Sequence, residues 1–213
     1  MTLIVLVHQV RWSRINSNQI LVFSDNDRGI TRPGNRSSYP CGRSEKPLRG
    51  PGDSFTVLIK KLVVVANGLT IGIESASGGP LVKQGSGGVG HNRNSMGISI
   101  RNIQAVAGKE PRECIRVAGT LCGPKMYLFQ SGDRLKFALR EQKGVHDGEQ
   151  DVLALDFYLN GEVFFTAPIP TWFMLPFIPL CTLPDDCTLI LEQQYSSPTR
   201  SRVQRRGWRT ATR

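Results

Sequence analysis

The sequence predicts an all-β fold in which two antiparallel sheets pack face to face as a sandwich, over about residues 18–192. The chain contains 22 glycines and 13 prolines, residues that favour turns, spread between short apolar segments. In those segments the apolar residues occupy every second position, which is the pattern of a half-buried strand. No segment of helical length shows the apolar spacing of an amphipathic helix.

The first half of the chain contains three strand signals. Ile20–Phe23 is a short apolar run that ends in the turn cluster Asp25–Asp27. Apolar residues then alternate in 55–62 and in 69–73. Asn67-Gly68 lies between these two runs, and Asn-Gly tolerates the positive φ angles of a tight turn. We therefore expect the two runs to pair as a β-hairpin.

The second half contains the clearest local signal, Asn160-Gly161, which separates two apolar runs and predicts another hairpin. Further strands are expected at 96–100, 135–139, 153–159, 163–165, 177–180 and 188–191. Side chains spaced by two along the strands should fill the core, namely Phe55, Val57, Ile59, Ile71, Ile73, Leu135, Phe137, Leu155, Phe157 and Leu159.

Segments outside the alternating pattern divide the rest of the chain. Residues 1–17 are expected to form an N-terminal strand or leader, too short in its apolar part to span a membrane, so we expect no membrane partner. The polar, glycine-rich segment 78–94 is expected to be a long loop, and 141–151 an exposed hairpin insertion. Residues 193–213 have little to bury and are expected to be a disordered tail.

The net charge of +10 is concentrated at the two ends. Residues 1–50 carry +5 and 193–213 carry +6, whereas 51–192 carry −1. An arginine-rich end can bind nucleic acid or remain solvated, and the sequence leaves both alternatives open.

Cysteine usage indicates a reducing compartment. The five cysteines form an odd set without C-x-x-C spacing, which does not resemble a disulfide framework. His8, His91 and His146 are far apart, so we expect no metal site and no cofactor. The expected location is the cytoplasm, with the nucleus as an alternative.

Signals for catalysis are weak. Residues 85–90 match G-x-G-x-x-G, but no helical pattern follows, so a loop is the better interpretation. No G-x-S-x-G motif is present, and Pro184-Asp185-Asp186 reads as a turn. We therefore expect no catalytic residues and no enzyme activity. A hydrolase whose residues assemble only in space stays open as an alternative.

Three stretches resemble the SPRY domain family, whose fold is a bent, concanavalin-like sandwich. They are Leu21–Pro33 with the later F-x-V-x-I run of 55–59; the I-G-I run of 71–73 with Asn94–Gly97; and Gly132–Leu135 leading through 155–161 to Pro176–Leu180. Neuralized-type repeats are similar. The chain departs from both patterns, because Met96 replaces the usual aromatic residue of an S-W-G turn and 63–66 lacks the tryptophan of Neuralized repeats.

The resemblance implies a module that binds a protein or peptide and recruits substrates for a ubiquitin ligase. Members of the family bind partners on loops at one edge of the sandwich. Carried over by motif, that edge would use Arg32, Pro33 and Asn35 from an early loop and Leu183, Pro184 and Asp185 from the loop between the last two strands. Arg32 would donate a fork of hydrogen bonds to the partner, over an apolar floor.

Overall fold

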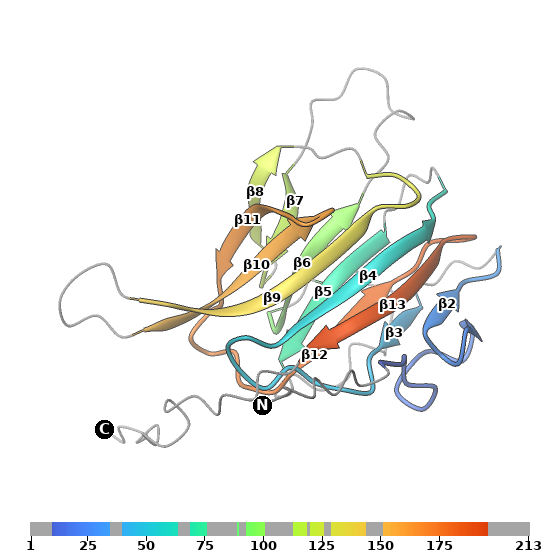
Figure 1. Cartoon of the computed structure of the whole chain (residues 1–213), viewed down its shortest axis with the longest axis horizontal. Coiled ribbons are helices and arrows are strands. Elements are labelled where there is room, and N and C mark those ends of the chain that lie inside the picture. Colours follow the sequence, from blue (N-terminus) through green and yellow to red (C-terminus); the bar gives the residue numbers. More distant parts are fainter. Residues whose placement is uncertain are drawn as a thin grey trace, which may run out of the picture.

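Two antiparallel sheets form a sandwich in the computed structural model (Figure 1). The residues described are 10–34, 40–63, 69–75, 89, 93–100, 113–118, 120–125, 129–143 and 151–195, and these form thirteen strands and no helix. The all-β, two-sheet antiparallel fold class predicted from the sequence is confirmed.

Seven strands form one sheet and six form the other. In spatial order the seven-stranded sheet contains β1 (Val22–Ser24), β2 (Gly29–Thr31), β13 (Thr188–Tyr195), β4 (Ser54–Lys61), β9 (Arg134–Gln142), β10 (Val152–Leu159) and β11 (Glu162–Pro168). The six-stranded sheet contains β3 (Cys41–Arg43), β12 (Phe177–Thr182), β5 (Leu69–Ser75), β6 (Ser95–Ile100), β7 (Glu113–Val117) and β8 (Thr120–Lys125).

The core lies between the sheets and contains the side chains predicted to face it. Nine of the ten expected residues are at most 1% exposed, and Leu159 is partly buried against them. Phe55 and Phe137, opposite each other on β4 and β9, stack with ring centroids 4.6 Å apart, and Phe157 packs edge-on at 5.4 Å from Phe137. The alternation thus identified the buried face of each strand correctly.

The β10–β11 hairpin predicted at Asn160-Gly161 is confirmed. Leu159 pairs with Glu162 across the turn, and Asn160 and Gly161 have φ angles of 51° and 96°. Two successive positive φ angles are the requirement of a tight hairpin turn that matches strand twist. The turn cluster Asp25–Asp27 between β1 and β2 also has positive φ angles throughout.

The other predicted hairpin is wrong, because β4 and β5 belong to different sheets. β4 pairs with β13 and β9, whereas β5 pairs with β12 and β6. Both strands bury alternate residues, and this pattern is the same whether the next strand pairs alongside or crosses to the opposite sheet. Asn67-Gly68 lies outside the described residues.

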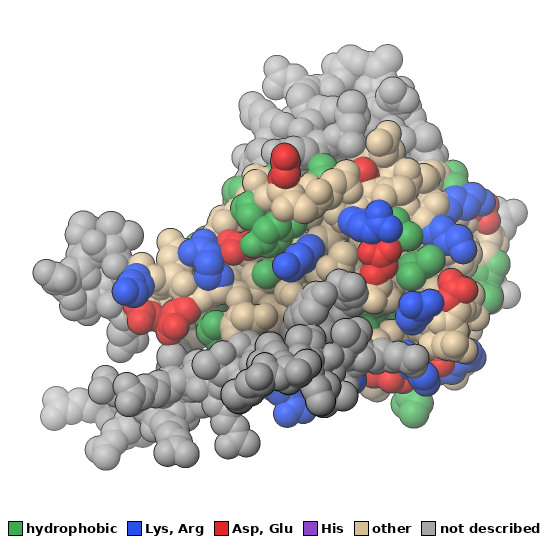
Figure 2. Space-filling view, viewed as in Figure 1, with side chains coloured by type: hydrophobic (Ala, Val, Ile, Leu, Met, Phe, Trp, Pro, Cys, Tyr) green, Lys and Arg blue, Asp and Glu red, His purple; other side chains and the backbone are tan. Residues whose placement is uncertain are grey.

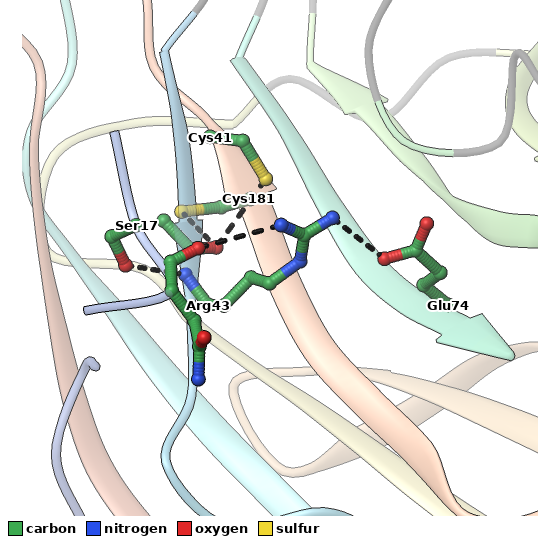
Figure 3. Close-up of polar contacts among 7 residues, drawn as sticks. Ser17, Cys41, Arg43, Glu74 and Cys181 are labelled. Atoms are coloured by element: carbon green, nitrogen blue, oxygen red, sulfur yellow. Dashed lines mark hydrogen bonds and ion pairs between the residues drawn. The ribbon is translucent and has the colours of Figure 1, made fainter. Parts of the chain in front are cut away.

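Residues 10–17 are part of the sandwich. Trp12 is fully buried and bridges Ser44, and the Ser13 amide donates to the Arg43 carbonyl at 2.6 Å. Ser17 Oγ accepts the Arg43 amide at 2.9 Å (Figure 3). At the other end, β13 continues to Tyr195, which pairs with Ser54. The described sandwich therefore extends beyond the expected limits of 18 and 192 on both sides.

The outer face of the six-stranded sheet is polar and buried. Arg43 reaches from β3 past β12 to Glu74 on β5, with Nη2 and Oε2 2.9 Å apart and both side chains at most 7% exposed (Figure 3). Val89, within the segment expected to be a long loop, is fully buried on this face and donates its amide to Thr70 Oγ1 at 2.8 Å. At least this residue of the 78–94 segment is therefore packed on the sheet.

Candidate partner-binding edge

Two loops meet at one end of the sandwich. β2 and β13 are antiparallel neighbours with Thr31 opposite Thr188, so the end of β2 lies beside the start of β13. The Asp186 amide donates to the Arg32 carbonyl at 2.9 Å, and the Arg32 amide donates to the Cys187 carbonyl at 3.4 Å. The predicted juxtaposition of the Arg32 and Leu183 loops is confirmed. We call residues 32–34 and 183–187 the loop edge.

Arg32 holds the loop edge together from inside. Its side chain is 4% exposed, and Nη1 donates to the Leu183 carbonyl at 3.3 Å. Its Nε forms an ion pair with Asp185 Oδ1 at 2.8 Å. The guanidinium of Arg32 is therefore buried and bound to the neighbouring loop, and it is not exposed toward a partner as expected from the sequence.

The outer surface of the loop edge is formed by Pro33, Gly34 and the two aspartates. Pro33, Gly34 and Asp186 are exposed, and the Asp185 side chain is 35% exposed. A Cβ atom on Gly34 would lie 3.5 Å from Asp186 Oδ2, so the two loops are in near contact at the surface. The charged side chains at this surface are Asp185, which is paired with Arg32, and Asp186, and exposed Lys61 lies beside them opposite Thr188.

Leu183 and Pro184 are buried beneath this surface, in agreement with the apolar floor expected from the sequence. The turn expected at 184–186 is present, with Asp186 at a φ of 57° and the Cys187 amide donating to the Pro184 carbonyl. Asn35, the sixth expected partner-binding residue, lies outside the described residues. The structure thus brings the other five together but places only Pro33 and Asp185 at the surface.

A third loop borders the edge. The Val63 amide, just after β4, donates to Cys187 Sγ at 3.5 Å, and the Leu62 amide donates to Ser131 Oγ at 2.9 Å. Burial raises the pKa of the Cys187 thiol, so this group is protonated at neutral pH. The thiol of Cys187 therefore acts here as a packing and hydrogen-bonding group.

Metal binding and nucleophilic catalysis find little support in the described part of the chain. There, no group of three or more His, Cys, Asp or Glu residues is placed to hold a metal ion. Burial raises the pKa of Cys41 to about 12, so this thiol is a poor nucleophile at neutral pH. The three histidines and most of the 85–90 motif lie outside the described residues. Within the same part of the chain, no helix has the length and hydropathy to cross a membrane.

The outer face of the seven-stranded sheet carries both signs of charge (Figure 2). Arg134 pairs with Glu192 and Arg140 with Asp156, each at 2.9 Å, and Lys136 lies over the Tyr158 ring at 5.1 Å. These cations contact partners on other strands of the same sheet, and the Arg134–Glu192 pair spans β4. Among the residues that the structure describes, cations and acids are therefore interspersed on this face and do not form the continuous basic surface that a phosphate backbone requires.

Sequence reasoning missed one exposed feature, the loop 170–176 between β11 and β12. Trp172 and Met174 are 52% and 61% exposed there. The apolar run has no strand periodicity and is bounded by Pro170 and Pro176, which is the signal that could have identified it. This loop lies at the end of the sandwich opposite the loop edge, because β12 runs from one to the other (Figure 1).

The element order and the two sheets define a sandwich of the SPRY type. No protein-family model matches the chain, and no curated protein matches its sequence.

Solved structures do match the fold of this chain. The TRIM65 PSpry domain has a TM-score of 0.61 and 13% identity, with coverage of 88% of this chain and 93% of that chain. A human SPRY domain has a TM-score of 0.57 and 16% identity, covering 81% and 94%. The SPRY domain of human HERC1 has a TM-score of 0.55 and 10% identity, covering 85% and 97%. The chain therefore has a SPRY-type fold, as the sequence resemblance predicted.

Proposed function

We propose that the chain is a protein-interaction module that binds a protein or peptide segment at the loop edge. The observation that carries this proposal is the internal clamp of Arg32 on Leu183 and Asp185, which fixes two loops far apart in sequence. Loops ordered before binding lose less conformational entropy when a partner docks, and rigid scaffolds commonly present binding loops in this way.

The chemistry of the surface restricts the partner. Pro33 and Gly34 offer a flat, uncharged contact area, and Asp185 and Asp186 add carboxylate oxygens beside it. Carboxylates accept charge-assisted hydrogen bonds, so a segment with lysine, arginine or free backbone N–H groups is complementary. In this proposal Pro33, Asp185 and Asp186 touch the partner, while Arg32, Leu183 and Pro184 position them. A role for Asn35 stays a prediction.

Recruitment of substrates for a ubiquitin ligase is the finer form of the proposal, and the sequence resemblance to SPRY domains supports it. The buried, unpaired thiols of Cys41, Cys181 and Cys187 support a location in the cytosol or nucleus. We do not favour nucleic-acid binding, because Arg134 and Arg140 on the charged face of the described sheet are paired with acids. Binding by the arginine-rich tail stays a prediction.

The test is a comparison of Asp186→Asn with Asp25→Asn. Both aspartates are exposed, have positive φ angles and lie in turns at the two ends of the short strand β2, and asparagine tolerates the same backbone conformation. Affinity purification from cells with quantitative mass spectrometry should show partners that are lost with Asp186→Asn and retained with Asp25→Asn. Titration of a purified partner should show binding weaker by ~3–10-fold for Asp186→Asn, equivalent to one hydrogen bond. Equal retention of every partner by the two variants would contradict the proposal.

A further inference from the structure

The loop 170–176, which we call the Trp172 tip, presents two large apolar side chains to solvent. Trp172 is 52% exposed and Met174 61% exposed, whereas Phe173 between them is 8% exposed and packs on Phe177 with ring centroids 6.4 Å apart. Phe173 thus anchors the loop in the core while its two neighbours point outward. Tryptophan and methionine are enriched in the buried centres of protein interfaces.

Polar contacts hold the Trp172 tip in this conformation. Ser75 Oγ accepts a hydrogen bond from the Met174 amide at 2.9 Å and donates one to the Met174 carbonyl at 3.0 Å. The Phe173 amide donates to the Pro170 carbonyl at 2.9 Å, and Trp172 Nε1 donates to the Arg93 carbonyl at 3.4 Å. The loop that bears the exposed side chains is therefore hydrogen-bonded to β5 and to residue 93. It should lose little conformational entropy when a partner binds.

The charge around the Trp172 tip is mainly positive. The Arg93 guanidinium lies over the Trp172 ring at 5.9 Å from its centroid and is exposed. Segment 44–49 runs beside the start of β12, because Leu48 bridges Phe177, and this pairing places exposed Arg49 opposite Pro176. The same segment contributes Lys46 and one exposed acid, Glu45.

We propose that the Trp172 tip is a second protein-docking surface, for an acidic segment that inserts an apolar side chain beside Trp172 and Met174. Arginine over an exposed tryptophan combines a cation with an aromatic face, and acidic residues at two positions of the partner segment would complement Arg93 and Arg49. The surface is separate from the loop edge, since the six residues of β12 lie between them, a length of about 20 Å.

Two other occupants fit the charges less well. A second copy of the chain that docked through its own Trp172 tip would bring like charge to the same cations. An anionic membrane would attract the cations, but a tip that inserts into lipid presents its aromatic ring fully, whereas about half of Trp172 is covered by its own domain.

The experiment is a selection of random peptides of about twelve residues displayed on phage, with the whole chain as bait and Trp172→Ser/Met174→Ser as the counter-selection bait. We expect enriched peptides in which an aromatic or aliphatic residue is flanked by Asp or Glu. A synthesised peptide from the enriched set should bind the double variant about tenfold more weakly than the wild type. Arg93→Glu should also weaken binding, and the affinity should fall with added salt.

Matched controls separate this surface from the loop edge and from unfolding. Val163 on β11 is 53% exposed, an exposed fraction similar to that of Trp172. Val163→Thr therefore removes exposed apolar surface outside the Trp172 tip and should leave the peptide affinity unchanged. Asp186→Asn should leave the peptide affinity unchanged as well. A negative result for the Trp172 tip can therefore be distinguished from a negative result for the loop edge. Circular dichroism and urea midpoints should match the wild type for every variant.

Several results would overturn the inference. These are no enrichment after counter-selection, enriched peptides without acidic residues, or peptides that bind the double variant as tightly as the wild type. Sedimentation that shows a Trp172-dependent dimer would assign the surface to a second copy. Trp172-dependent binding to phosphatidylcholine vesicles with about 30% phosphatidylserine would assign it to a membrane.

Discussion

The guanidinium of Arg32 and the carboxylate of Asp185 meet beneath the surface of the loop edge, with side chains 4% and 35% exposed. Their sequence separation of more than 150 residues hides this relation, since an arginine beside a proline in a turn-rich segment resembles an exposed contact residue. The guanidinium instead adds side-chain contacts between the two loops to the hydrogen bonds that their backbones form. At the scale of single residues, the order of the loop edge therefore depends on a side chain that, in the proposed function, need not touch the partner.

Arg32→Ala should lower the free energy of unfolding. The substitution leaves the Leu183 carbonyl without this donor and Asp185 without its cation, and removing one partner of a buried polar contact costs about 1–3 kcal/mol. Urea unfolding followed by tryptophan fluorescence measures the change. Arg134→Ala is the matched control, because Arg134 also pairs with an acid but is largely exposed, and this variant should unfold close to the wild type. An Arg32→Ala midpoint equal to that of Arg134→Ala would show that the clamp does not stabilise the loops.

Two glycines lie opposite each other on β5 and β6, and they determine how closely these strands and Val89 can pack. Gly72 pairs with Gly97, and a Cβ on Gly97 would meet the Ile71 carbonyl and lie 2.9 Å from Val89 Cγ1. Without side chains at this position, Val89 lies directly over the sheet and its amide reaches Thr70. At the scale of elements, the absence of Cβ atoms is what allows a connecting segment to cover the outer face.

Gly97→Ala should destabilise the fold by overpacking. The new methyl group meets backbone on β5, which cannot move aside as a flexible side chain can, so we expect a loss of about 1–3 kcal/mol. Gly50→Ala is the control, because a Cβ there has nothing within 4 Å, and its effect should stay within about 0.5 kcal/mol. Urea midpoints of the two variants, measured side by side, give the difference. Similar midpoints would mean that β5, β6 and Val89 are packed less closely than described.

The sandwich as a whole is closed at one side by residues 10–17, which lie outside any alternating apolar pattern. Trp12 is fully buried, and Val10 beside it is 1% exposed. Arg43 ties the same segment to the six-stranded sheet, with its amide donating to Ser17 Oγ and its Nη1 donating to the Asn16 carbonyl. At the scale of the molecule, residues 10–17 are therefore part of the packed core.

Trp12→Ala should therefore destabilise the whole domain. Truncating a fully buried aromatic side chain leaves a cavity and costs about 3–5 kcal/mol, a large share of the stability of a domain this size. Differential scanning calorimetry should show a single transition at a markedly lower temperature. Trp172→Ala provides the comparison, because its ring is half exposed, and its transition should stay near that of the wild type. A small shift for Trp12→Ala would place residues 10–17 outside the cooperative unit.

The sequence by itself determined the fold class, the buried face of most strands and the β10–β11 hairpin. Alternation with a period of two reports which side chains are buried, and Asn160-Gly161 encodes its turn locally through positive φ angles. The resemblance to SPRY domains also placed the Arg32 and Leu183 loops together, and the pairing of β2 with β13 brings them there.

Only the tertiary structure decided which strands are neighbours, which polar groups are buried and which apolar groups remain outside. β4 and β5 have the same pattern as a hairpin yet lie in different sheets. Arg32 is buried while Trp172 is half exposed, the reverse of what their residue types suggest. The physical reason is that burial depends on contacts between segments far apart in the chain, such as Arg32 with Leu183 and Trp172 with Arg93. A local pattern cannot specify such contacts.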